Sequence, residues 1–136
     1  MRYFDSWVWL EYVLGGPRGD VAADLVNDAY DDGCVTSAIS ISEIGYIVHR
    51  ELGRETADLV TSSIDDANSI RVVPVSSEIA YQGATLRSKY YDRRERELSY
   101  ADAIQIATAI HTDCDVIHTG DSDFADLDEI ETVLHR

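Results

Sequence analysis

Four acidic residues stand where an apolar stretch ends or where a helix is expected to begin. They are Asp5, Glu43, Asp102 and Asp121. In a sheet of parallel strands, ligands collect beyond the carboxyl ends of the strands, where loops and helix N-termini are exposed together. Two carboxylates ~4 Å apart repel by up to about 4 kcal/mol at an effective dielectric constant of about 20, so converging acids must take up protons or bind a cation. Mg²⁺ and Mn²⁺ prefer such oxygen ligands, and the pattern therefore predicts a divalent-cation site able to promote displacement at a phosphodiester.

Several of these acids also have a purely structural interpretation. Asp5 can cap the helix that follows it, because an Asp in this position accepts hydrogen bonds from the first backbone N–H groups. Glu43 has the S-x-x-E spacing of a capping box with Ser40, which would occupy its side chain. Asp121 and the neighbouring Asp123 are common turn residues. Taken singly, these positions are compatible with either interpretation.

The remaining acid, Asp102, lies on the same stripe of its helix as Gln105 and Thr108. Such a stripe is typical of a solvated helix face, and an acid in the first turn also interacts favourably with the helix dipole. The rest of the same helix is apolar nearly all round, which indicates that most of it is buried. Both interpretations of Asp102 therefore stay open.

Short stretches rich in Val and Ile alternate with longer helical patterns, which is typical of βα units and a parallel sheet. Strands are expected at 2–5, 34–37, 70–75, 115–119 and 130–134. Helices are expected at 7–14, at 20–30, from the Ser40–Glu43 capping box onward, at 55–67, from a Ser76 or Ser77 cap to about residue 97, and at 100–112. No linker or repeat divides the chain. We therefore predict one α/β domain, 1–136, folded as a three-layer α/β/α sandwich around a central parallel sheet.

The composition favours a reduced, cytoplasmic protein. Cys34 and Cys114 form neither a CxxC pair nor a Cys/His zinc spacing, and 136 residues suffice for a core without disulfides. Acids interrupt the apolar residues at the N-terminus, so no export signal is expected. No apolar stretch is long enough to cross a bilayer, so we expect no membrane association.

The charge composition is strongly acidic, with 26 Asp and Glu against 11 Lys and Arg and a formal net charge of −15. Of the acids, 17 are Asp, and only one of the basic residues is Lys. In ordinary salt such a charge repels both itself and nucleic acid, whereas concentrated salt shortens the range of both repulsions. We therefore expect a halophilic, archaeal source.

Four segments carry a resemblance to a known family. They are FDSWVWLEY at the start, SISEIGYIVHR in the middle, and SYADAIQIATAI and VIHTGDSDFADL near the end. Together they resemble the PIN-domain family and, within it, the VapC toxins of toxin-antitoxin pairs. The resemblance covers nearly the whole chain and is most specific in the last third. It implies a metal-dependent endoribonuclease with an α/β/α fold and an acidic pocket for Mg²⁺ or Mn²⁺, commonly a homodimer, with an RNA substrate and a VapB-type antitoxin as partners.

The resemblance also implies roles for individual residues. The catalytic acids of the family fall on Asp5, Glu43, Asp102 and Asp121. Asp5 and Asp102 look like the principal metal ligands, with Asp121 completing the set directly or through water. Glu43 would position a water or a second ion, and water activated in this pocket would attack phosphorus in line. Supporting residues or alternative ligands are Ser6, Thr119 and Asp123.

Basic residues cluster once along the chain, and an RNA backbone needs cations. Arg87, Lys89, Arg93, Arg94 and Arg96 fall within ten residues, with Tyr90 and Tyr91 among them. Arg pairs with phosphate and Tyr stacks on an unpaired base, so we expect RNA contacts there. The expected contacts are Arg87, Lys89, Arg93 and Arg94. A solvated helix face paired with Asp92, Glu95 and Glu97, or an antitoxin-docking surface, is the alternative.

Other classes of function fit the sequence less well. A receiver-like signalling domain needs paired acids after the first strand and a Lys after a late strand, but Asp5 has no acidic neighbour and Lys89 lies within an expected helix. Loss of Asp5, Asp102 or Asp121 would favour a non-catalytic interaction module, and all three are present. A PIN-domain RNA-processing nuclease outside any toxin-antitoxin system stays open, as do the RNA target and the choice between Mg²⁺ and Mn²⁺.

Overall fold

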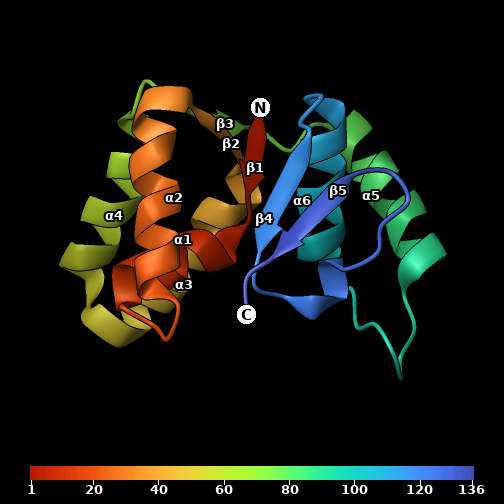
Figure 1. The fold of residues 1–136 in the computed structure, drawn as a ribbon, viewed down its shortest axis with the longest axis horizontal. Helices are drawn as coiled ribbons and strands as arrows, with labels where there is room; N and C mark the ends of the chain where they lie inside the picture. The colour runs from red at the N-terminus through yellow and green to blue at the C-terminus, as the bar shows by residue number, and fades with distance from the viewer.

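The computed structural model describes residues 1–136 and contains a five-stranded sheet in which every neighbouring pair of strands is parallel (Figure 1). The strands are β1 (Arg2–Phe4), β2 (Cys34–Ser37), β3 (Ile70–Val73), β4 (Val116–Thr119) and β5 (Glu131–Leu134). Their order across the sheet is β3-β2-β1-β4-β5. The sheet therefore has β1 at its centre, and the predicted parallel sheet is confirmed.

Helices cover both faces of this sheet. They are α1 (Ser6–Leu14), α2 (Gly19–Asp32), α3 (Ala38–Leu52), α4 (Arg54–Asp66), α5 (Ser77–Tyr90) and α6 (Tyr100–His111), followed by a 3₁₀ turn, η1 (Ser122–Phe124). Figure 1 shows α1 to α4 on one side of the sheet and α5 and α6 on the other. The predicted three-layer α/β/α sandwich is confirmed. No helix combines the length and the apolar character needed to cross a membrane.

Two hydrophobic cores, one on each face, hold the layers together. Successive strand residues point to opposite faces, and β1 shows this directly, because Tyr3 joins one core and Phe4 the other. The Tyr3 core contains Ile106 of α6 and Ile117 of β4, whereas the Phe4 core contains Val8 of α1. Both faces of the central strand are thus buried, as expected for a parallel sheet.

The parallel register brings three strand ends to one edge of the sheet. Phe4 is paired with His118 in β4, and Tyr3 with Val35 in β2, so the chain leaves these strands at similar heights. The residue that follows β1 is Asp5, which lies next to the end of β4. We call this region the carboxyl edge of the sheet, and it is where the predicted acids were expected to meet.

The predicted capping box of Ser40 and Glu43 is wrong. Helix α3 begins at Ala38, and its cap is Ser37, whose side chain accepts a hydrogen bond from the Ile39 backbone N–H at 3.2 Å. Ser37 ends β2 in an extended conformation, so the chain passes from strand to helix without a loop. Ser40 lies within α3 and is fully buried, so it is not the cap of this helix. The Glu43 side chain is therefore not occupied by a capping box.

Two predicted elements, β3 and α5, end two or more residues earlier than expected. Strand β3 stops at Val73 instead of residue 75, because Pro74 has no backbone N–H for the ladder. Helix α5 stops at Tyr90 instead of about residue 97. After it, the Asp92 carboxylate accepts hydrogen bonds from the Arg94 and Glu95 backbone N–H groups, a local bonding pattern that competes with a helix. The basic cluster therefore lies partly on α5 and partly on the loop 91–98.

Aromatic stacking fixes the start of α1 against the end of the chain. The Trp7 indole lies parallel to the His135 ring, with centroids 6.0 Å apart, and His135 stacks in turn on His118 at 5.2 Å. The same two histidines share a hydrogen bond of 2.9 Å between Nδ1 of His118 and Nε2 of His135. Gly120 lies against the Trp7 ring, where a Cβ atom would collide with it.

We predict that Gly120→Ala destabilises the fold. The added methyl group would overlap the Trp7 ring, which must then move away from His135, and overpacking of this kind lowers the free energy of unfolding by about 1–3 kcal/mol. Urea denaturation in molar KCl measures the change. The matched control is Gly45→Ala within α3, where the new Cβ would make an ordinary contact of 3.5 Å with Thr61 Cγ2 and should leave stability equal or up to about 1 kcal/mol higher. Equal stabilities of the two variants would contradict this packing.

Candidate metal centre

Asp5 is the buried acid around which the site is built. Its side chain caps α1, with Oδ1 accepting a hydrogen bond of 2.9 Å from the Trp7 backbone N–H. Its other oxygen, Oδ2, accepts a hydrogen bond of 2.5 Å from the Thr119 hydroxyl. The residue is only 4% exposed. Asp5 is thus a helix cap as well as a candidate ligand, since each carboxylate oxygen has a second lone pair.

Thr119 connects Asp5 to the turn that follows β4. It donates to Asp5 and accepts a hydrogen bond of 2.9 Å from the Asp121 backbone N–H. The Asp121 carboxylate caps η1 by accepting from the Asp123 N–H at 2.9 Å. Asp121 and Asp123 are therefore turn residues, as one interpretation held, and the charge of Asp121 also acts on Asp5. Thr119 was expected as a supporting residue, and it hydrogen-bonds Asp5 directly.

Asp102 lies in the first turn of α6 and closes a capping box. Its backbone N–H donates to the Ser99 hydroxyl at 3.0 Å, and its Oδ2 accepts from the Ser99 N–H at 3.1 Å. The other oxygen, Oδ1, makes no hydrogen bond within the protein. The interpretation of a solvated stripe is wrong, because Gln105 and Thr108 are both buried.

Gln105 is the functional residue that sequence reasoning missed. Its amide oxygen accepts hydrogen bonds from the Tyr3 hydroxyl and the Ser40 hydroxyl, both at 2.9 Å. Its amide nitrogen donates to Ser6 Oγ and to Glu43 Oε1, both at 3.3 Å. This one side chain therefore joins α6 to β1, α1 and α3, and it holds Glu43 at the carboxyl edge. The only sequence signal was a single amide on an otherwise apolar helix.

Burial, and then repulsion by neighbouring carboxylates, raises the pKa values of Asp5, Glu43, Asp102 and Asp123. Burial raises the pKa of Asp5 to about 8, and the charge of Asp121 adds to this. Burial also raises the pKa of Glu43, helped by the charge of Asp102, and the pKa of Asp102, helped by Asp121 and Asp123. The pKa of Asp123 is raised by burial and then by Asp121. None of the five acids forms an ion pair with Lys, Arg or His. We call these four acids and Asp121 together the acidic pocket, and the charge of Arg96 partly offsets the rise in the pKa of Asp123.

The chemistry of this pocket fits a hard divalent cation. Every candidate donor is a carboxylate oxygen, and Mg²⁺ and Mn²⁺ prefer oxygen ligands while keeping several waters. No three His, Cys, Asp or Glu side chains lie close enough together to form the ligand set of one ion, so the acids would have to move closer to bind one jointly. Asp5, Asp102 and Asp121 are the residues that would hold the cation, and Glu43 would lie beside it.

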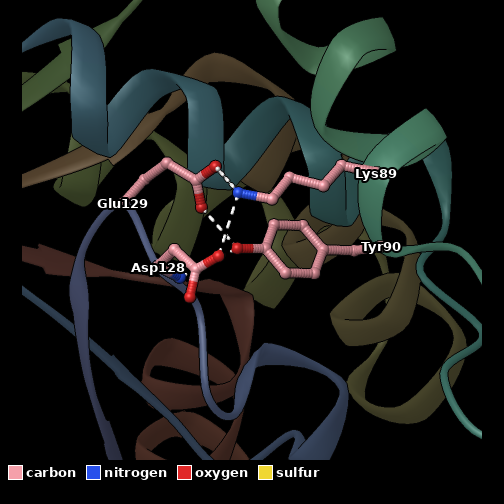
Figure 2. Close-up of polar contacts among 4 residues, drawn as sticks. All are labelled: Lys89, Tyr90, Asp128 and Glu129. Atoms are coloured by element: carbon pink, nitrogen blue, oxygen red, sulfur yellow. Dashed lines mark hydrogen bonds and ion pairs between the residues drawn. The ribbon is translucent and has the colours of Figure 1, made fainter.

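The basic cluster divides into paired and unpaired residues. Figure 2 shows Lys89 held by two acids, with Nζ 3.0 Å from Asp128 Oδ2 and 2.9 Å from Glu129 Oε2. The Tyr90 hydroxyl donates to Glu129 at 2.6 Å and accepts from the Asp128 backbone N–H at 2.8 Å. These partners differ from Asp92, Glu95 and Glu97, which the alternative of a solvated helix face had assigned to the cluster. Lys89 thus fastens the end of α5 to the loop before β5.

Three other basic residues of the cluster lie beyond α5. Arg93 and Arg94 are exposed on the loop 91–98 and form no ion pair. Arg96 is half-buried, and its Nη2 donates to the Ala125 carbonyl oxygen at 2.7 Å. Arg93 and Arg94 are therefore the members of the cluster most accessible to a ligand.

Comparison with known proteins agrees with this architecture. The PIN domain family matches residues 2–130, and the chain therefore belongs to that family. The fold is similar to that of VapC20 of Mycobacterium tuberculosis, described as a toxin that cleaves the sarcin-ricin loop, with 20% identity, a TM-score of 0.81 and coverage of 96% of this chain and 98% of the other.

Two further solved structures share the fold. FitAcB from Neisseria gonorrhoeae is 24% identical, with a TM-score of 0.70 and coverage of 97% and 96%. VapBC2 from Rickettsia felis, bound to a DNA fragment of its promoter, is 13% identical, with a TM-score of 0.75 and coverage of 98% of both chains. No curated protein sequence matches this chain. The structural matches confirm the predicted VapC-like fold.

We predict that, without divalent cations, stability falls with rising pH because of Asp5. Its folded pKa is raised from 3.8 to about 8, so its stabilising contribution is complete below pH 3.8 and is lost as pH rises through about 8. In EDTA the wild type should therefore lose up to about 1.4 kcal/mol per pH unit relative to Asp5→Asn, which does not titrate. Urea denaturation between pH 5 and pH 8 measures this difference, a window that lies inside the range set by the two pKa values. Parallel pH profiles of the two proteins would contradict the burial of Asp5.

Proposed function

We propose that this protein is a metal-dependent endoribonuclease and the toxin of a type II toxin-antitoxin pair. The observation that supports this best is the acidic pocket at the carboxyl edge, where burial and then neighbouring carboxylates raise the pKa values of Asp5, Glu43 and Asp102 and no basic side chain forms an ion pair with them. A structural ion pair would supply such a cation from the protein. A pocket that lacks one fits a function in which a divalent cation is bound instead.

In this proposal the acids have different tasks. Asp5, Asp102 and Asp121 hold Mg²⁺ or Mn²⁺, which supplies charge stabilisation for a phosphodiester displacement. Gln105 holds Oε1 of Glu43, and this fixes the carboxylate in a position to orient the attacking water. Its raised pKa makes it a stronger base than a solvent-exposed Glu. Thr119 keeps Asp5 in place by donating a hydrogen bond to it.

In this proposal, the exposed arginines on the loop 91–98 attract the RNA backbone electrostatically. Arg93 and Arg94 are exposed and have no acidic partner, so they can pair with phosphates. Lys89 is engaged by Asp128 and Glu129, and its part in RNA binding is correspondingly smaller. In a protein with a net charge of −15, exposed cations without acidic partners favour the approach of an RNA strand at this loop.

The partners follow from the same proposal. One solved structure with this fold is a toxin-antitoxin complex from Klebsiella pneumoniae, 21% identical with a TM-score of 0.68, and another is a VapBC complex bound to promoter DNA. We propose that a VapB-type antitoxin inhibits this protein and that it forms a homodimer in the cytoplasm. A halophilic source remains our prediction from the Asp and Arg content.

Cleavage of mixed tRNA and rRNA in molar KCl tests the proposed activity. Wild-type protein should cleave with Mn²⁺ and not with EDTA, and Asp102→Asn should lower the rate by about a hundred-fold or more, because the variant loses a carboxylate ligand. The matched control is Asp113→Asn, an exposed Asp with a positive φ of 55° at the opposite end of α6, where Asn is well tolerated. Cleavage that persists in EDTA, or equal rates for Asp102→Asn and Asp113→Asn, would contradict the proposal.

A further inference from the structure

Arg87 of α5 lies against two tyrosine rings that come from different segments. Its guanidinium carbon is 4.3 Å from the centroid of the Tyr91 ring and 4.2 Å from that of the Tyr100 ring. Its Nε donates a hydrogen bond of 3.0 Å to the Leu98 carbonyl oxygen, which holds the side chain in this position. The arrangement joins the end of α5, the loop 91–98 and the first residue of α6.

A surface cavity of about 320 Å³ opens beside this group. Its lining consists of Ala84, Arg87, Ser88, Tyr91 and Tyr100. Tyr91 is 42% exposed and Tyr100 is 71% exposed, so both rings present accessible faces or edges to a ligand. The cavity therefore combines aromatic surface, a hydroxyl group and a cation within reach of solvent.

The charge of Arg87 is not compensated within the protein. It forms no ion pair, and its only hydrogen bond uses Nε, so its Nη groups remain available. Lys89, two residues along the same helix, contrasts with it by pairing with both Asp128 and Glu129. In a chain with more than twice as many acids as bases, an arginine held by tyrosines instead of carboxylates favours an anionic ligand.

We propose that the cavity of Arg87, Tyr91 and Tyr100 is a subsite for an unpaired nucleobase of a single-stranded RNA. A base would stack on Tyr100, while the Nη groups of Arg87 would donate to its edge or to the adjoining phosphate. Tyr100 opens α6 two residues before Asp102, so the subsite lies close to the acidic pocket. This inference rests on the proposed ribonuclease function and names the part of the substrate recognised beside the cleavage site.

The chemistry of the cavity favours a nucleobase over other occupants. An apolar protein side chain would leave the Nη groups of Arg87 without partners, whereas a nucleotide offers both a stacking face and oxygen acceptors. An acidic peptide would pair with Arg87 but would make little use of Tyr100. The two classes of ligand therefore differ in how strongly binding depends on the Tyr100 ring.

Binding of a short single-stranded oligoribonucleotide, measured by fluorescence anisotropy in EDTA, tests the subsite without cleavage. Tyr100→Ala should weaken binding about ten-fold or more, and Tyr100→Phe should bind like the wild type, because stacking needs the ring and not the hydroxyl. The matched control is Tyr81→Ala, which removes a 77% exposed tyrosine of α5 outside the cavity and should change nothing. An abasic oligomer with the same phosphates should bind wild type and Tyr100→Ala equally. Circular dichroism melting confirms that each variant folds.

Two results would overturn the subsite: no oligoribonucleotide binding by the wild type, or equal affinity of Tyr100→Ala and wild type for the base-bearing oligomer. Equal affinity together with a change of oligomeric mass in Tyr100→Ala would assign the cavity to protein contacts. Cleavage with Mn²⁺ is scored separately. If the wild type cleaves RNA but the Tyr100→Ala substitution leaves the affinity for the oligoribonucleotide unchanged, only the subsite is wrong. If binding depends on Tyr100 but no cleavage occurs, only the nuclease function is wrong.

Discussion

Burial of carboxylates at the carboxyl edge, to which their mutual repulsion adds, is the constraint on which the rest of this structure depends. A buried, uncompensated acid such as Asp5 weakens the folded state once it is charged, as the rise of its pKa to about 8 reflects. Proteins usually compensate such groups with Arg or Lys, yet none of the 11 Lys and Arg residues here forms an ion pair with Asp5. The fold therefore retains buried carboxylates whose charging lowers its stability, at a place where a cation from solution can bind and offset this effect. Such behaviour is expected of a functional site.

The remaining architecture holds these acids apart at fixed positions. Parallel pairing of β1 with β4 places Asp5 beside Thr119, whose hydroxyl spans the gap between Asp5 and the turn that carries Asp121. On the other side of β1, the buried amide of Gln105 connects α6 with Ser6 and Glu43. Hydrogen bonds to caps and to a buried amide thus orient the carboxylates before any ligand arrives. Preorganisation of this kind lowers the cost of assembling a metal site.

The sequence predicted the features that follow from local periodicity and failed where distant residues decide. Alternating βα patterns identified the parallel sheet. Asp5 was predicted as a site residue because the end of a strand can be recognised in the sequence. The Ser40–Glu43 spacing misled because S-x-x-E also occurs inside a helix, and the true cap, Ser37, lies at the end of a strand. Gln105 could not be recognised as a connector, since its partners lie 62 to 102 residues away, and no local pattern shows such contacts.

Calorimetric titration of Mn²⁺ into the metal-free protein in molar KCl tests the central claim most directly, namely that the acids of the carboxyl edge form a divalent-cation site. The account predicts saturable binding by the wild type, strong weakening in Asp5→Asn and Asp121→Asn, and unchanged binding in Asp24→Asn, which removes a charge from the exposed side of α2. Equal weakening in all three variants would show only a general effect of net charge. That result, or Mn²⁺ binding that survives the loss of Asp5 and of Asp121, would contradict the account.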